Sequence, residues 1–382
     1  AATTSPRLKN GIPHHKTGRM NKTIWDKNSK SFLQNYLDNA SPTGREESGQ
    51  KIWLDYIKPY VDDYDIDHYG TAYGIINPGQ EKRIVIEAHA DEISWFVNYI
   101  SKDGFLYVIR NGGSDNEIAP GKKVIIHTPK GPVKGVFGWP AIHTRKSKTT
   151  TKPDIEKLFI DVGAKDKKEV EKMGVHVGCI VTYPEKLDLH NDKYYVGRAL
   201  DNRMGGFCIA QVARLLSENQ IQLPYSLYIV NAVQEEVGLR GAQMIAHRIK
   251  PTAAIITDVT HDTSTPHMDA KKHGDVKCGS GPTVTYGPAV HYHLIDLIIE
   301  AAESNDIPLQ REAASRSTGT DTDAFAYSNE GVPSALISLP LRYMHTTVES
   351  AHKDDIENLI KLIYHTLLMI DGTETFKYFK PK

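Results

Sequence analysis

Side chains that could bind a metal ion or transfer a proton follow four strand-like segments of this 382-residue chain. Each segment is short, apolar and rich in β-branched residues, as a buried strand would be. In α/β proteins the carboxyl ends of the strands converge on one edge of the sheet, where ligands bind. We therefore expect the side chains at these ends to meet in one site. They are His89 with Asp91, the adjacent pair Glu235 and Glu236, Asp258, and His345.

Asp201 joins this set, because it stands at the start of a predicted helix, where its side chain can project towards the sheet edge. The set then offers two imidazoles and several carboxylates, and so much negative charge would not stay ionised in one place without cations. Histidine and carboxylate ligands without cysteine suit Zn²⁺ or Co²⁺ better than Mg²⁺ or Ca²⁺. Five ligands exceed the need of one ion. The expected cofactors are therefore two divalent ions, bridged by a shared carboxylate, with a water between them.

The elements that must position these residues follow a βα rhythm with one interruption. Helical periodicity is found at 22–40, 46–57, 202–216, 241–248, 293–303 and 354–370, and strand patterns at 63–68, 72–76, 83–91, 227–233, 253–257 and 334–339. Between about residues 92 and 192, short β-like runs alternate with Gly and Pro, which is typical of a small β-barrel or sandwich. The chain is thus predicted to be an α/β sandwich interrupted by a β-rich insertion.

Composition excludes several classes of protein. The 46 basic and 47 acidic side chains nearly balance, so no overall field favours nucleic acid or an anionic membrane. No run is long and apolar enough for a transmembrane helix. The three cysteines are widely spaced and odd in number, which argues against a disulfide framework and favours a reducing, cytoplasmic compartment. Residues 1–19 carry no secretory signal and are expected to be a tag or a disordered tail.

Six motifs stand in an order that resembles the dinuclear-metal aminopeptidases of the glutamyl/deblocking type, which build tetrahedral (TET) particles. They are His89-Ala-Asp91, the segments 199–206, 234–241 and 257–261, Gly319-Thr-Asp321, and the segment 342–349. The resemblance extends from about residue 23 to 370. It implies a three-layer α/β/α catalytic domain formed by residues 20–91 and 192–382. It also implies an inserted small β-barrel, PDZ-like, at 92–191 that serves dimerisation.

The resemblance also implies a role for each candidate residue. Asp201 would bridge two metal ions, with His89 and Asp258 completing one ion and Glu236 and His345 the other. Glu235 would be the general base, and Asp91 would hold His89 from behind. The substrates would be peptides. The assembly would be a homo-oligomer in which dimers build a tetrahedral dodecamer, with no nucleic-acid or membrane partner.

The sequence leaves open the charge around the ligands, the packing surface, two alternative functions, the substrate preference and the metal. Asn202 follows the bridging position where relatives often carry a second aspartate, so the charge around the ligands is expected to differ. Phe137 and Trp139 are candidates for a packing surface between subunits. A glycoside hydrolase using Glu235 and Glu236, or a non-catalytic scaffold, are the alternative functions. The preferred N-terminal residue, and the choice among zinc, cobalt and manganese, stay undecided.

Overall fold

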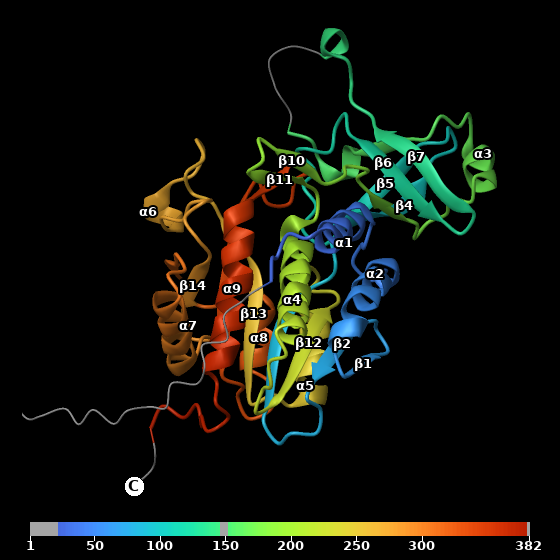
Figure 1. Ribbon diagram of the computed structural model, residues 1–382. Helices are drawn as coiled ribbons and strands as arrows, with labels where there is room; N and C mark the ends of the chain where they lie inside the picture. The colour runs from blue at the N-terminus through green and yellow to red at the C-terminus, as the bar shows by residue number, and fades with distance from the viewer. Residues whose placement is uncertain (1–21, 146–151, 380–382) are drawn as a thin grey trace, which may run out of the picture.

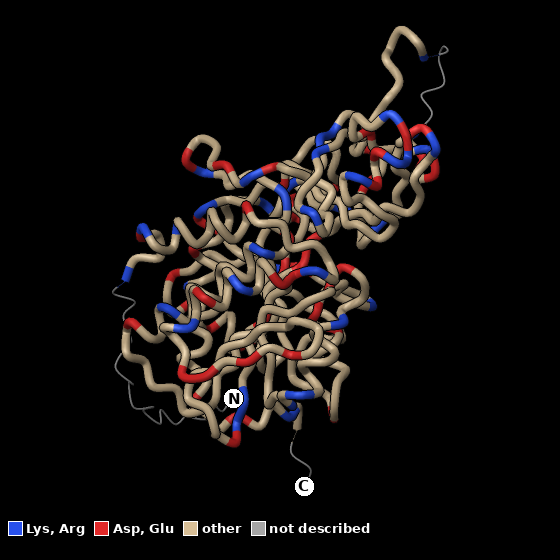
Figure 2. Tube along the Cα trace, turned by 90° about the vertical axis from the view of Figure 1, so that its right-hand side faces the viewer, with Lys and Arg blue, Asp and Glu red and all other residues tan. Residues whose placement is uncertain are grey.

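The computed structural model describes residues 22–145 and 152–379 (Figure 1). The expectation of a tag or disordered tail at 1–19 lies outside these residues. The described chain has two parts: a large α/β body, and a smaller β-barrel that lies at one end of it, beside α1 (Figure 1). Basic and acidic residues are interspersed over both parts, as Figure 2 shows, in agreement with the near balance of charge.

The α/β body is built on one mixed sheet, which has eleven strands in the described residues. Its order is β1-β2-β12-β3-β13-β16-β17-β11-β10, and β14 joins both β16 and β15. The central pairs β12 with β3, β3 with β13, and β13 with β16 are parallel, so their carboxyl ends share one edge. The strands are β1 (Asp63–Ile66), β2 (Ala72–Ile76), β3 (Arg83–His89), β10 (Asp188–His190), β11 (Tyr194–Gly197), β12 (Ser226–Ala232), β13 (Ala253–His261), β14 (Thr283–Tyr286), β15 (Gln310–Ala313), β16 (Ser334–Arg342) and β17 (Glu349–His352).

Helices cover both faces of this sheet, which gives the predicted three layers. One face packs on α1 (Lys27–Asp38), α2 (Glu47–Ile57), α4 (Leu200–Glu218), α7 (Tyr292–Ser304) and α9 (Lys353–Met369). The other face packs on α5 (Arg240–Ile249) and α8 (Asp321–Ala326). The central strands are buried on both faces and therefore read as continuous apolar runs rather than alternating ones. Short helix α6 (Ala270–His273) lies outside these layers (Figure 1).

The inserted part is a closed antiparallel barrel, in which six strands of the described chain pair in the order β4-β5-β8-β7-β6-β9. The strands are β4 (Ser94–Ile100), β5 (Leu106–Asn111), β6 (Lys123–Thr128), β7 (Gly131–Phe137), β8 (Phe159–Asp161) and β9 (Ile180–Thr182), with helix α3 (Lys167–Lys172) between the last two. The barrel has its own apolar core, which includes Trp95, Val97 and Leu106. The fold class predicted from the sequence is confirmed.

One prediction about the barrel is wrong. Phe137 was expected on a packing surface, but it is only 1% exposed and packs edge-on against Trp95 inside the barrel. The strand alternates between inside and outside, so Phe137 faces in while its neighbour Val136 faces out. Trp139, which follows the strand, is 38% exposed as expected.

The described residues also bear on two predictions from composition. Among them no helix has the length and apolar character needed to cross a bilayer. Cys179, Cys208 and Cys278 are all free thiols.

Candidate metal centre

The structure brings together all the residues that the sequence analysis placed in one site. His89 is the last residue of β3 and pairs in register with Ala232, the last residue of β12. The chain then turns after β12 and presents Glu235 and Glu236 to the same edge. Asp258 extends from β13, the other neighbour of β3. The side chains converge because neighbouring parallel strands direct their carboxyl ends to the same edge of the sheet.

Two imidazoles lie on opposite sides of the Asp201 carboxylate. His89 Nε2 is 3.1 Å from Asp201 Oδ1, and His345 Nε2 is 3.2 Å from Asp201 Oδ2. Asp201 is buried, and it reaches this position from the first turn of α4. One carboxylate therefore offers one oxygen to each half of the site.

Each half contains further carboxylates. His89 Nε2 lies 3.7 Å from Glu235 Oε2 and 3.8 Å from Asp258 Oδ1. On the other side, His345 Nε2 lies 3.5 Å from Glu236 Oε1. The ligand atoms of His89, Glu235 and Asp258, and likewise those of His89, Asp201 and Glu236, all lie within 4.8 Å of one another. Such spacing fits the donor atoms around a divalent ion, and by distance alone Glu235 could also be a ligand.

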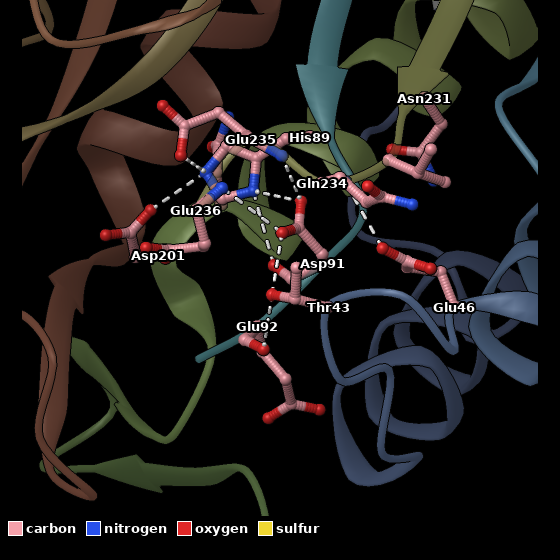
Figure 3. A network of polar contacts seen from close by, with 12 residues as sticks. Thr43, Glu46, His89, Asp91, Glu92, Asp201, Asn231, Gln234, Glu235 and Glu236 are labelled. Atoms are coloured by element: carbon pink, nitrogen blue, oxygen red, sulfur yellow. Dashed lines mark hydrogen bonds and ion pairs between the residues drawn. The ribbon is translucent and has the colours of Figure 1, made fainter. Parts of the chain in front are cut away.

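Asp91 contacts His89, Glu235 and Glu236 at once and so fixes their orientation (Figure 3). It is fully buried, and its Oδ1 lies 3.3 Å from His89 Nδ1. The backbone N–H groups of Glu235 and Glu236 donate to its two oxygens at 3.0 and 3.2 Å, and the hydroxyl of Thr43 donates at 2.8 Å. Asp91 therefore ties the end of β3 to the turn after β12, as a residue behind a metal ligand often does.

A second carboxylate that organises the site, Glu349, was not among the residues predicted from the sequence. It is buried, and its two oxygens accept the backbone N–H groups of Asp201 at 3.1 Å and of His345 at 2.7 Å. It thus fixes the backbone of both residues that meet across the site. Its only sequence signal was its place four residues after His345, at the end of a motif that was assigned to His345 alone.

A loop of the barrel also reaches the site. The Nδ1 of His345 lies 3.2 Å from the carbonyl oxygen of Gly113, just after β5. A Cβ atom at Gly113 would come within 2.6 Å of that same Nδ1, so only glycine lets the loop approach this closely. No sequence pattern predicted this contact, because Gly113 and His345 are 232 residues apart and belong to different parts of the fold.

The site holds more carboxylates than its imidazoles can neutralise. Burial, followed by the neighbouring Asp258, outweighs the opposing effect of His89 and raises the pKa of Glu235 to about 11. Burial likewise raises the pKa of Asp258 to about 7. Burial acts against protonation of His345, but Asp201 and Glu236 raise its pKa to about 11. The chain by itself thus needs protons to balance this charge, and divalent cations would supply the balance instead.

A buried pair of carboxyl groups lies behind the site. Glu87, on β3, and Asp321, at the start of α8, are both essentially inaccessible to solvent. Burial raises the pKa of Glu87 to about 8, and burial together with Glu87 raises the pKa of Asp321 well above its usual value. Two carboxyls in contact cannot both ionise, so the pair holds a proton. Asp321, the last residue of the Gly319-Thr-Asp321 motif, therefore lies against Glu87, two residues before the proposed ligand His89 on β3.

Asn202, for which the resemblance implied a change of charge around the ligands, binds β13 through its amide. Its amide Nδ2 donates to the carbonyl of Thr257 at 2.7 Å, one residue before Asp258. It is almost fully buried. The neutral amide thus links the start of α4 to β13, where a carboxylate would instead face a carbonyl oxygen.

Comparisons with known proteins agree with this geometry. The family model of the M42 glutamyl aminopeptidases matches residues 70–362. A lysyl aminopeptidase of Pyrococcus furiosus is 33% identical over 334 residues, which cover 87% of this chain and 94% of that protein.

Solved structures show the same relationship. A TET aminopeptidase from the marine sediment archaeon Thaumarchaeota archaeon SCGC AB-539-E09 has a TM-score of 0.85 and 28% identity, and the match covers 91% of this chain and 98% of that one. The TET1 peptidase of Pyrococcus horikoshii, described as a tetrahedron or a large octahedral shell, has a TM-score of 0.78 and 28% identity, over 88% and 98% of the two chains. A structure from Thermotoga maritima named an endoglucanase has a TM-score of 0.71 and 26% identity, over 89% and 99%. With its α/β/α body, its inserted barrel and its cluster of side chains that could hold a metal ion, the chain belongs to the M42 glutamyl aminopeptidase family and is a hydrolase of the exopeptidase type.

Proposed function

We propose that this protein is a metal-dependent aminopeptidase that uses two divalent ions bridged by Asp201. His89 and Asp258 would complete one ion, and Glu236 and His345 the other. The observation that carries the proposal is the arrangement of the Asp201 carboxylate, whose two oxygens face two different histidines at 3.1 and 3.2 Å. A carboxylate that offers each of its oxygens to a different histidine is placed as a ligand bridging two ions would be.

The donor set supports metal binding and favours zinc or cobalt. Two imidazoles and three carboxylates converge there, and four of these five residues are buried or nearly so, whereas the side chain of His345 is 32% exposed. Mixed nitrogen and oxygen donors are typical of Zn²⁺ sites, and Mg²⁺ and Ca²⁺ prefer oxygen alone. When bound, such ions would polarise the scissile carbonyl group and lower the pKa of the attacking water.

Glu235 is assigned as the general base. Its carboxylate stands beside the ligands, and its backbone is held by Asp91, which limits where the side chain can go. Glu235 would accept a proton from the attacking water on Oε2 and deliver it to the amine of the departing peptide. Asp91 would keep the His89 ring in one orientation through Nδ1, leaving Nε2 to face the centre.

The acidic surroundings also fit an exopeptidase. The free α-amino group of a peptide is a cation, and the site holds carboxylates beyond the proposed metal ligands, Glu235 and Glu349 among them. A pocket beside the centre is lined by Ile93, Tyr183, Asp201, Glu236 and His345, among others. A cationic N-terminus would be attracted into this region, whereas a blocked one would not.

A glycoside hydrolase remains the second candidate, because one structural neighbour is named an endoglucanase. That chemistry needs two carboxyl groups on opposite sides of a sugar ring. Glu235 and Glu236 are adjacent in sequence, their backbones are fixed by the same Asp91, and each lies near an imidazole. This arrangement suits groups gathered around a metal ion better than groups on opposite sides of a sugar ring, so it favours the peptidase.

The test compares a free and an N-acetylated version of one peptide, together with a soluble glucan, using protein loaded with Zn²⁺ or Co²⁺. We expect stepwise release of N-terminal residues from the free peptide and none from the acetylated one. Internal cleavage of the acetylated peptide, or release of reducing sugar with neither peptide cleaved, would overturn the proposal.

We also propose the assembly and the domain division that the family resemblance implies. Residues 20–91 with 192–382 would form the catalytic domain, and the barrel region 92–191 would carry contacts between subunits. Tyr99, Ile109 and Val136 expose apolar surface on the barrel, which supports a packing role. We infer a cytoplasmic homo-oligomer, with a tetrahedral dodecamer as the expected form. Light scattering that showed only a monomer would contradict it.

A further inference from the structure

The carboxylate of Glu312, on β15, lies in a cradle of three threonine hydroxyls. Thr260 donates to Oε2 at 2.6 Å, and Thr283 and Thr285 donate to Oε1 at 2.9 and 2.8 Å. Thr283 and Thr285 are buried, whereas Glu312 itself is partly exposed. The hydroxyls therefore hold the carboxylate in one position and leave part of it open to solvent.

This carboxylate forms no close ion pair in the part of the chain that the structure describes. Within residues 22–145 and 152–379, no Lys, Arg or His nitrogen lies within 4.0 Å of a Glu312 oxygen. An ionised carboxylate can accept about four hydrogen bonds, so three neutral donors leave room for one more. Neutral hydroxyls orient the group without cancelling its charge. The cradle is thus organised to meet a cation.

The cradle lies close to the proposed metal centre. Thr260 follows Asp258 by two residues on β13, so both side chains project from the same face of the sheet, about 7 Å apart along the strand. His261, the next residue after Thr260, interacts electrostatically with Asp201 and His345 of the centre and also with Glu312, so the centre and the cradle lie within range of one imidazole. A long side chain attached to a residue at the centre could therefore reach Glu312.

We propose that Glu312 selects a substrate whose N-terminal residue has a cationic side chain, lysine or arginine. This rests on the proposed aminopeptidase function. The α-amino group and the scissile bond would lie at the centre, and the side chain would extend along β13 so that its charged end meets the free part of the carboxylate. An acidic side chain would be repelled from the same place, so Glu312 would both attract substrates with a basic N-terminal residue and exclude those with an acidic one.

The test compares lysyl and norleucyl p-nitroanilides, because norleucine is lysine without its terminal amine. In the wild-type protein we expect kcat/KM for the lysyl substrate to exceed that for the norleucyl one by about tenfold or more, as for a partly exposed charged hydrogen bond. Glu312→Gln should bring this ratio close to one while the norleucyl value stays within about twofold. Glu300→Gln removes an exposed carboxylate on α7 and should leave the ratio unchanged.

A binding measurement separates failure of this inference from failure of the proposed function. Calorimetric titration of the catalytically impaired Glu235→Gln protein with Lys-Ala-Ala and Nle-Ala-Ala should show the same preference, lost when Glu312→Gln is added. An equal lysine preference with and without Glu312, or a wild-type preference for norleucyl or glutamyl substrates, would overturn the inference. If no anilide or peptide is cleaved at all, the proposed function fails, and the binding preference still decides the role of Glu312.

Discussion

His89 and His345 contact different oxygens of a single carboxylate, that of Asp201, although the strands that they follow are separated by β13. His89 ends β3, whereas His345 follows β16, and neither strand pairs with the other. Asp201 enters between them from the start of α4. This relation defines two halves of one site and underlies the assignment of two ions.

The two halves should lose metal separately. His345→Ala removes a ligand from one half only, so we expect the purified variant to retain about one of two equivalents of zinc. Treatment with a chelator should remove both ions together with activity, and Zn²⁺ or Co²⁺ should restore it. Elemental analysis after dialysis measures this. His247→Ala, which removes an exposed histidine of α5 outside the proposed ligand set, is the matched control and should keep both ions. Two full equivalents in His345→Ala would exclude His345 as a ligand.

Replacing the proposed base should separate binding from catalysis. Glu235→Gln keeps the size of the side chain and removes its ability to accept a proton, so we expect kcat to fall by about 10² to 10⁴-fold. Metal content should stay at the wild-type level, because the five other residues hold the ions. Since Glu235 Oε2 lies only 3.7 Å from His89 Nε2, the variant also tests the alternative that Glu235 is a ligand. Loss of an ion from Glu235→Gln would establish that alternative.

The barrel should influence the centre through Gly113. In Gly113→Ala the new Cβ would meet His345 Nδ1 at 2.6 Å and Cε1 at 2.7 Å, so the ring must move. We expect affinity for one ion to fall by about 10 to 100-fold, with the other ion little affected, as for changes behind a ligand. Competition with a zinc-sensitive dye measures both affinities.

Gly121→Ala serves as the control for general destabilisation of the barrel. Gly121 has a φ of +81°, so alanine strains the turn, but the added Cβ touches nothing within 4 Å. This variant should lower the melting temperature and leave both metal affinities unchanged. If the two glycine variants bind metal equally well, Gly113 does not position His345.

The stability of the metal-free protein should depend on pH through Glu46. Burial, and then the nearby Asp91, raises the pKa of this carboxyl from 4.5 to about 8 in the folded protein. The unfolded chain loses that proton near pH 4.5, whereas the folded chain keeps it up to about pH 8. The contribution of Glu46 to stability is therefore complete below pH 4.5 and is lost as the pH rises towards 8, at up to about 1.4 kcal/mol per pH unit.

Glu46→Gln should remove this part of the pH dependence, because an amide does not titrate. Its oxygen can still accept the N–H groups of Gly44 and Gln234, which Glu46 Oε1 accepts at 2.8 and 3.2 Å. Urea unfolding of chelator-treated protein at pH 5 and pH 8 gives the measurement. The variant should lose less stability than the wild type between these values. Equal losses would show that Glu46 is already ionised at pH 5.

Much of the centre was predictable from sequence because the ligands stand where apolar strands end. The runs before His89, Glu235 and Asp258 belong to buried, neighbouring parallel strands that are directed towards the same edge of the sheet. Glu349 and Thr43 could not be predicted in the same way. Their contacts are made to backbone N–H groups and to Asp91, and they depend on how loops close around the site.

The elements of the fold likewise divide into those that the sequence predicted and those that it did not. The long amphipathic and buried elements were found, and the helix predicted at 202–216 is α4. The short strands β14 and β15 were not predicted, because Thr283, Thr285 and Glu312 interrupt any apolar pattern there. These polar side chains are buried or half-buried only because they satisfy one another, which is a tertiary property. The residues that sequence patterns overlook thus include Glu312, which is proposed to contact the substrate side chain.

The most direct test of the whole account is anomalous diffraction from crystals of the zinc-loaded protein. We expect two peaks, about 3.5 to 4 Å apart, one on each side of the Asp201 carboxylate. The first should contact His89 and Asp258, and the second His345 and Glu236. A single peak, or two peaks of which one does not touch Asp201, would contradict the bridged pair of ions on which the proposed function rests.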